Sequence, residues 1–454
     1  MSDWDEILDG LNRECLSMPG IEVELAAQRV LYDVTKFNED GIFQNLSERR
    51  TRITARVVSG GRLGEASADG PLREAAKYAK ESAIRAAVHS RPVPAGYRFP
   101  ETTQIPLVQS RFEETAQFSP DARAEIIRDV ANHAAEPGIG LSGSYHVSQI
   151  ERFVVNSSGT RVANAATEVD INYIAHSDTS RAHSGQADRD VSMLDLPGLA
   201  REACRRCREG RNPREIPSGD YQIVLLPNAV ADLMPFLGML VFSALADMEG
   251  RSAISGRIGS RMLSPLIHIW DDAIDPRGLT EAFDSEGVAK RRTDLVQAGV
   301  PLGFVHDSLT AARTGGVSTG HAFPSTPAVY GPIPSNLFIG PGEVSLDQMI
   351  EEVEKGLLIT RLHYVRCLDA KSTTVGGVTS DGTFLIQNGK IVYPVRQMRF
   401  AESILSLLGR VRGVGKHFQT LRRMTQGPGP VSIYPSAFTV PALSIESLAL
   451  RETT

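Results

Sequence analysis

Apolar residues in the first 210 positions recur at two spacings. In residues 5–16, 71–90, 119–136 and 196–209 they return every three or four positions, which is typical of helices with one buried face. In residues 52–58 and 141–178 they alternate with polar residues, as in strands. The sequence Asn156-Ser157-Ser158-Gly159 interrupts the second of these stretches and predicts a turn between two antiparallel strands. The pattern therefore predicts a sheet flanked by helices.

A polar segment separates this part of the chain from the next. Residues 210–220 hold two prolines and two glycines between strongly patterned stretches, which is typical of a linker. A chain of 454 residues is also too long for one hydrophobic core. We therefore expect two domains, residues 1–212 and residues 220–454.

The second part is richer in strand patterns. It opens with an apolar strand at residues 221–226 and a strongly apolar helix at about residues 229–248. Short strands and loops follow, and Asn388-Gly389 between two apolar runs predicts a tight hairpin. The expected fold class is α+β: an N-terminal helix-flanked sheet domain, then a β-rich C-terminal domain with one buried helix.

Composition excludes several classes of protein. Hydrophobic residues make up 41% of the chain, which argues against disorder, and 48 basic against 54 acidic residues give a net charge of -6. That balance gives no reason to expect nucleic acid as a partner. Four cysteines are too few for a disulfide framework and suit a reducing compartment. The acidic N-terminus and the absence of an apolar run of roughly 20 residues predict a soluble cytoplasmic protein without a membrane partner.

Few residues suggest a site from their spacing. His321 lies in a stretch rich in proline and glycine, and loops of this length inside a domain are often functional. His363 and Cys367 are four residues apart, but their segment reads as extended, which would separate them by roughly 13 Å, too far to share a metal. These three residues define a weak alternative site for a hydrolase that works alone.

Three stretches of the second half resemble the TldD/PmbA family, also called the modulator-of-gyrase family. The first is the strand at 221–227 that leads into the apolar helix, and the second comprises residues 267–272, 283–288 and 303–307. The third runs from Asn336-Leu337-Phe338-Ile339 to Asn388-Gly389-Lys390-Ile391. The likeness also reaches residues 45–48 in the first half.

The resemblance implies a particular metal site, and this chain departs from it. In the family's catalytic subunits a helix after the first strand carries HExxxH, whose histidines hold zinc together with a cysteine near the C-terminus, while the glutamate acts as base. The matching positions here are Met234, Pro235 and Met239, and the segment that matches the cysteine, residues 413–416, has none. Thioethers are poor zinc ligands and proline cannot accept a proton. We therefore expect no catalytic residue and no metal or other cofactor in this chain.

The likeness thus implies a TldE/PmbA-type subunit without zinc. Such subunits pair with a TldD-like catalytic subunit, which carries the zinc, in a heterodimeric peptidase for unfolded peptides. The implied role is to enclose the substrate, with peptide captured by strand addition. Whether this chain is itself an enzyme stays open, and two alternatives remain: a hydrolase around His321, His363 and Cys367, or a regulatory binding module.

Overall fold

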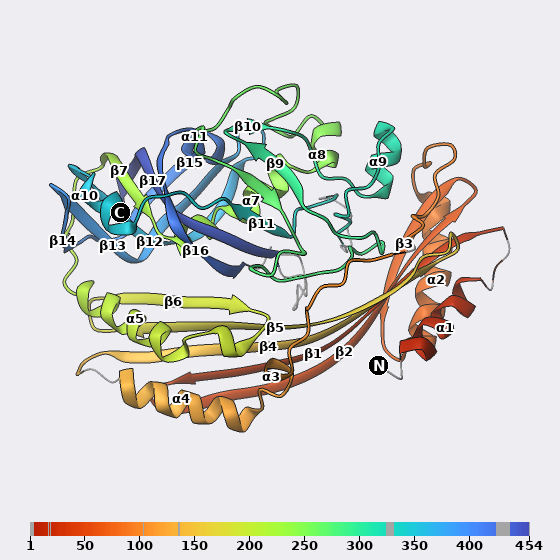
Figure 1. Ribbon diagram of the computed structural model, residues 1–454, viewed down its shortest axis with the longest axis horizontal. Helices are drawn as coiled ribbons and strands as arrows, with labels where there is room; N and C mark the ends of the chain where they lie inside the picture. The colour runs from red at the N-terminus through yellow and green to blue at the C-terminus, as the bar shows by residue number, and fades with distance from the viewer. Residues whose placement is uncertain are drawn as a thin grey trace.

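The computed structural model describes residues 4–16, 18, 20–102, 104–134, 137–323, 331–423 and 436–453. Two sheets organise these residues, and Figure 1 shows the second above the concave face of the first. The fold is α+β, as predicted. Within the described residues, no helix combines the length and the apolar character needed to span a membrane.

The first sheet has six antiparallel strands in the order β3-β2-β1-β4-β5-β6. The strands are β1 (Glu22–Asn38), β2 (Gly41–Ser59), β3 (Arg62–Asp69), β4 (Gly140–Asn156), β5 (Arg161–His176) and β6 (Arg181–Asp188). The predicted pairing of β4 with β5 around the turn at 156–159 is confirmed. The sequence pattern had not indicated β1, and it gave only the second half of β2.

Helices cover one face of this sheet. They are α1 (Trp4–Cys15), α2 (Leu72–His89), α3 (Glu113–Ala116), α4 (Pro120–Ala134) and α5 (Leu196–Glu209), with a 3₁₀ turn η1 (Val191–Met193) before α5. Odd-numbered residues of β1, such as Val23 and Leu25, pack against α1 and α2, and Phe37 packs in the core beneath α4 and α5. Even-numbered residues, such as Glu24 and Ala26, face the second sheet. Because successive side chains of a strand point to opposite faces, one face of β1 packs against the helices and the other faces the second half of the chain.

The second sheet has eleven strands. They are β7 (Gly219–Leu225), β8 (Ile269–Asp271), β9 (Thr293–Gln297), β10 (Val300–Pro301), β11 (Asn336–Ile339), β12 (Lys355–Asp369), β13 (Thr374–Gln387), β14 (Lys390–Pro394), β15 (Met398–Ser403), β16 (Val411–Arg423) and β17 (Ser436–Glu452). β17, β15, β13, β12 and β7 pair in sequence, and β7 also pairs with β17, so these five strands close into a ring. Asn388 and Gly389 have φ angles of 48° and 73°, which suit the predicted hairpin between β13 and β14.

The single long helix predicted at residues 229–248 is wrong. Three short helices take its place: α6 (Pro227–Ala231), α7 (Met234–Val241) and α8 (Ala244–Met248). Pro235 has no N–H to donate to the carbonyl of Ala231 and its ring would clash with it, so α6 cannot continue through this point. The break before α8 arises because Phe242 and Ala244 bond to the backbone of Val305 across Ser243. The remaining helices are α9 (Ser308–Thr314), α10 (Leu346–Glu351) and α11 (Ile404–Gly409).

A buried charge cluster joins the two halves of the chain. Arg56 on β2 bonds to Glu24 on β1 at 3.0 Å and to Glu286, which belongs to the second half. Glu286 in turn accepts bonds from the backbone N–H and the hydroxyl of Ser308, each at 2.8 Å, at the start of α9. Tyr97 bridges Arg56 at 3.0 Å and Ser308 at 2.8 Å. A second contact pairs Arg152 on β4 with Glu281.

Two carboxylates in this cluster share one guanidinium. Burial raises the pKa of Glu24 from its ordinary value of 4.5 to about 8, against the opposing effect of Arg56. Burial likewise raises the pKa of Glu286. Glu24 is therefore protonated in the folded chain at a pH where it is ionised in the unfolded chain, and unfolding releases that proton. Its contribution to stability is present below pH 4.5 and is lost as the pH rises to about 8.

We predict that Glu24→Gln weakens the dependence of folding stability on pH between pH 5 and pH 8. The wild-type melting temperature should fall between pH 5 and pH 8 more steeply than that of the variant, because a glutamine side chain has no proton to release. Thermal unfolding followed by circular dichroism across this range measures the difference. Glu113→Gln, at an exposed carboxylate, is the control and should follow the wild type. Parallel curves for the wild type and Glu24→Gln would contradict the prediction.

Candidate functional site

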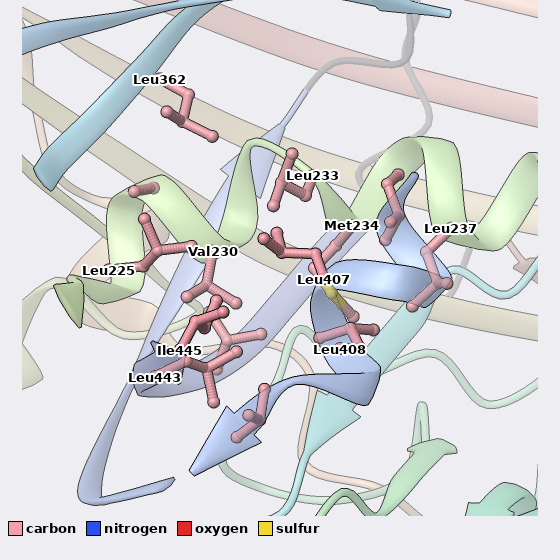
Figure 2. Close-up of a cluster of buried hydrophobic side chains, with 14 of the residues drawn as sticks. Leu225, Val230, Leu233, Met234, Leu237, Leu362, Leu407, Leu408, Leu443 and Ile445 are labelled. Atoms are coloured by element: carbon pink, nitrogen blue, oxygen red, sulfur yellow. The ribbon is translucent and has the colours of Figure 1, made fainter. Parts of the chain in front are cut away.

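Helix α7 carries Met234, Pro235 and Met239, the three positions that the sequence resemblance matched to HExxxH and that are called the metal register below. It lies in the largest apolar cluster of the described residues. Met234 is 1% exposed, and Figure 2 shows it among Leu407 and Leu408 of α11, with Leu443 and Ile445 of β17 nearby. Pro235 and Met239 are partly buried on the same helix. The segment around the matching cysteine position lies in β16, where Val414 belongs to the same core cluster as Met234. The two segments thus contribute to one apolar cluster, in which Met234 and Val414 pack with other apolar side chains.

Charged residues fix the junction between α6 and α7. Asp232 accepts hydrogen bonds from Nε of Arg423 at 2.6 Å and from the backbone N–H of Leu362 at 3.0 Å. Arg423, the last residue of β16, also bonds to the side chain of Asn228 on α6 at 3.0 Å. This link holds β12, β16 and the start of α7 together. The junction between α6 and α7 is therefore held by an ion pair, hydrogen bonds and core packing.

The residues at this register do not fit zinc. A zinc site needs about four nitrogen, sulfur or carboxylate donors around one point, and Met234, Pro235 and Met239 supply no imidazole, thiolate or carboxylate. In the parts of the chain that the structure describes, no group of three or more His, Cys, Asp and Glu residues is arranged to hold a metal ion. No catalytic step through a metal can be assigned to these residues.

His321 is buried in a polar cluster of its own. Its Nε2 lies 3.1 Å from Oδ1 of Asp271 on β8, and its Nδ1 lies 2.9 Å from the hydroxyl of Thr319. Oδ2 of Asp271 accepts the N–H of Asn336 at 2.7 Å. His321 and Asp271 have no exposed side-chain surface. This arrangement has the connectivity of a hydroxyl–imidazole–carboxylate triad, but solvent and substrate cannot reach it.

The pKa values agree with a structural role for this pair. Burial lowers the pKa of His321, and the nearby Lys290 lowers it further against the attraction of Asp271. Burial would raise the pKa of Asp271, but His321, Lys290 and the N–H of Asn336 together hold it below its usual value. At neutral pH the pair is a neutral imidazole bonded to a carboxylate, which satisfies a charge that would otherwise be buried alone.

His363 and Cys367 lie elsewhere. Both are exposed on β12, which is extended as predicted but bulges at Tyr364, where φ is 51°. β12 pairs with β13 and β7, whereas β8, which carries Asp271, pairs with β9 and β11, so the two strands are not neighbours in the sheet. Burial and then Asp369 raise the pKa of the Cys367 thiol, which disfavours the reactive thiolate. The structure therefore does not bring the three residues of the alternative site together.

Sequence reasoning missed the buried charges. Asp271, Glu281, Asp284, Glu286 and Lys290 are all nearly inaccessible to solvent. Burial raises the pKa of Asp284 to about 7. Asp271 ends β8 and the other four lie between β8 and β9, where apolar neighbours such as Ala282 and Phe283 were a signal of burial in the sequence.

These observations define a class: a two-sheet α+β protein whose buried helix α7 offers no imidazole, thiolate or carboxylate ligand. A family model described as the PmbA/TldA metallopeptidase C-terminal domain matches residues 218–451, and a second, described as the central domain, matches residues 113–209. The chain therefore belongs to the PmbA/TldD family, as the sequence resemblance implied.

Curated relatives and solved structures agree with this assignment. The chain is 26% identical to a protein named "Metalloprotease" from Methanothermobacter thermautotrophicus over 84% of this chain and 85% of that protein. It is 23% identical to "Metalloprotease PmbA" from Escherichia coli O157:H7 over 88% of each. Its fold is similar to that of TldE from Thermococcus kodakarensis, with a TM-score of 0.85, 21% identity and 99% of both chains covered. A structure from Thermotoga maritima, named as a modulator of a DNA gyrase, aligns with a TM-score of 0.84 and 20% identity over 98% of this chain and 99% of that one.

We predict that replacing Met234 changes stability according to side-chain volume. Met234→Ala should lower the unfolding free energy by roughly 2–5 kcal/mol because it leaves a cavity, and Met234→Leu by less than about 1.5 kcal/mol. Urea unfolding measures both values. Met193→Ala, at a methionine that is 69% exposed, is the control. If Met234→Ala left stability unchanged, the packing role of this position would be refuted.

We also predict that His321 matters for stability and His363 does not. His321→Leu removes the imidazole that pairs with Asp271 and should cost on the order of 3 kcal/mol, since it leaves a buried carboxylate short of a partner. The exposed His363→Leu should stay within about 0.5 kcal/mol of the wild type. Urea unfolding again provides the measurement, and equal effects of the two variants would show that the buried pair does not stabilise the fold.

Proposed function

We propose that this chain is a non-catalytic, TldE-like subunit of a heteromeric zinc peptidase. The observation that carries the proposal is Met234, which occupies a position of the metal register and is sealed in a cluster of leucines. Family relatives are named metalloproteases, so metal-dependent proteolysis is the activity expected around this fold. Because this helix offers no metal ligand, a TldD-like partner has to supply the zinc and the base.

In this proposal the chain contributes enclosure and substrate contact. An unfolded peptide is the substrate class that strand addition would suit, since main-chain hydrogen bonds recognise an extended chain with little regard to its side chains. The likeness in fold to TldE over 99% of both chains supports the subunit type. Processing of peptides by the complex follows from the partner's chemistry, and this chain's part is to hold the substrate beside the partner's metal.

The two alternatives gain less support. A hydrolase that works alone would need its candidate residues in one accessible place, whereas His321 is fully buried and His363 and Cys367 are exposed on a distant strand. A regulatory binding module would share the fold, but no contact or surface of the described residues favours it over the subunit role.

The proposal predicts that the purified chain alone binds less than about a tenth of an equivalent of zinc and does not cleave an unfolded peptide such as reduced casein. Adding a relative with an intact HExxxH helix should produce a complex and cleavage. Zinc by atomic spectroscopy, cleavage by mass spectrometry and complex formation by co-purification are the measurements.

A matched control separates the partner's role from that of this chain. Replacing the glutamate of the partner's HExxxH by glutamine should abolish cleavage and keep the complex. Stoichiometric zinc and robust cleavage by the isolated chain would refute the proposal, and so would a failure of the chain to bind any such relative.

A further inference from the structure

The outer face of the strands β12, β13, β15 and β17 is covered at one end and open at the other. At the covered end, Phe384 of β13 belongs to one buried cluster with Met349 of α10. At the open end, Arg366 on β12, Arg399 on β15 and Arg451 on β17 are exposed. The open end therefore presents positive charge from three strands.

Two of these arginines stand directly opposite each other. Arg399 and Arg451 are Cα partners in the antiparallel pairing of β15 with β17. The adjacent Phe400 and Leu450 belong to the core, so both guanidinium groups project from the outer face. Like charges at opposed positions destabilise a strand pair. The side chains of Arg366, Arg399 and Arg451 form no ion pair or hydrogen bond with a residue that the structure describes, so this positive charge is uncompensated within the described chain.

Aromatic and aliphatic side chains lie beside the arginines. The pairing of β12 with β13 is irregular between His363 and Arg366, and a bulge of this kind re-aims the side chains of a strand. The ring centroids of His363 and Tyr364 are 4.3 Å apart, and Tyr364 is 68% exposed. Leu368 is 56% exposed and lies over the strand, since a Cβ at Gly376 would be 2.7 Å from its Cδ1. Exposed tyrosine and arginine side chains are typical of surfaces that bind another polypeptide.

This combination is a local feature of the protein. The chain as a whole has a net charge of -6. Other exposed arginines are paired with acidic residues: Arg412 lies 2.6 Å from Glu446, and Arg111 lies 2.6 Å from Glu113. We use the name arginine face for the six exposed residues His363, Tyr364, Arg366, Leu368, Arg399 and Arg451. Concentrated positive charge on an acidic protein favours an anionic partner at this place.

The arginine face begins next to the first sheet. Asp381 on β13 pairs with Arg361 on β12 at 2.9 Å and lies 3.7 Å from Arg181 at the start of β6. Arg361 precedes His363 by two residues on β12, and residues two apart on a strand share a face. A chain that lies along the arginine face thus extends toward the contact between the two sheets.

We propose that the arginine face binds an acidic segment of an unfolded peptide substrate. Carboxylates of the segment pair with Arg399 and Arg451 and remove the repulsion between them, because a guanidinium group binds a carboxylate through two parallel hydrogen bonds. An apolar side chain of the segment packs on Tyr364 and Leu368. The inference rests on the proposed function in taking an unfolded peptide as the ligand, and it adds a preference for peptides that combine acidic with apolar residues.

Fluorescence anisotropy with the full chain alone tests this preference. The probe is a fluorescein-labelled peptide of Glu-Leu-Gly repeats, which is compared with the same peptide carrying glutamine in place of every glutamate. The glutamate peptide should bind with a dissociation constant at least about tenfold lower. This difference should shrink as the salt concentration rises, since contacts between exposed charges are screened.

A pair of matched double variants locates the binding. Arg399→Gln/Arg451→Gln should raise the dissociation constant of the glutamate peptide about tenfold, since each exposed ion pair contributes up to about fivefold. Its melting temperature should not fall, because the substitution removes a contact between like charges. Arg111→Gln/Arg412→Gln changes the net charge equally and should alter the dissociation constant less than about twofold. Tyr364→Gly removes the ring, suits the φ angle of 51° and should weaken binding about fivefold.

Several results would overturn the proposal. Equal binding of the glutamate and glutamine peptides is one, and equal effects of the two double variants is another. A single-stranded oligonucleotide that binds more tightly than the glutamate peptide, and loses affinity in Arg399→Gln/Arg451→Gln, would assign the face to nucleic acid instead. None of these results bears on the subunit role, because the chain is measured without a partner. A chain that prefers the glutamate peptide but binds no HExxxH-bearing relative would refute the subunit role and support the arginine face.

Discussion

The arrangement of the two halves depends on one guanidinium shared by acidic side chains from both. Arg56 lies on the face of β2 that is turned away from the helices, and it reaches Glu24 of its own sheet and Glu286 of the other half. A buried charge is stable only when it is paired and hydrogen-bonded, so this contact requires Arg56 and its partners to keep their relative positions. Ser308 and Tyr97 complete the set of partners and connect α9 to the same point. Polar contacts between the two halves, among them those of Arg56 with Glu286 and of Arg152 with Glu281, thus help to set the relative position of the two sheets.

On α7, methionine contributes to core packing. Its thioether fills space without offering a ligand that zinc prefers, and Pro235 lies in the first turn of the helix. The polar link between Asp232, Arg423 and Asn228 keeps the start of α7 in place. The start of α7 is thus fixed by polar contacts, while Met234 itself is part of the apolar core.

The sheet that carries Arg56 also has an incomplete edge. β3 is shorter than β2, and the uncovered part of β2 exposes apolar side chains on a strand without proline. The buried cluster at Arg56 and the unpaired segment thus belong to the same strand, one near each end.

Local sequence patterns determined part of the secondary structure and the class of the fold. The helices at 71–90 and 196–209, the pair β4–β5 and the Asn388-Gly389 hairpin follow from spacing and turn chemistry, which act over a few residues. The family resemblance, and no local pattern, singled out Met234, Pro235 and Met239; that they are poor zinc ligands follows from the chemistry of the side chains themselves. The domain boundary near residue 212 stays a prediction.

Only the tertiary structure decided the rest. The division of residues 229–248 into three helices depends on Val305, which is distant in sequence and competes for the backbone of Phe242 and Ala244. The burial of His321 against Asp271, the separation of His363 and Cys367 from it, and the charge cluster at Arg56 all join residues far apart in the chain. Hydrophobic periodicity indicates which face of a helix or strand is buried. It does not indicate which residues pack against that face. Those residues determine which charged side chains are buried and which of them form pairs.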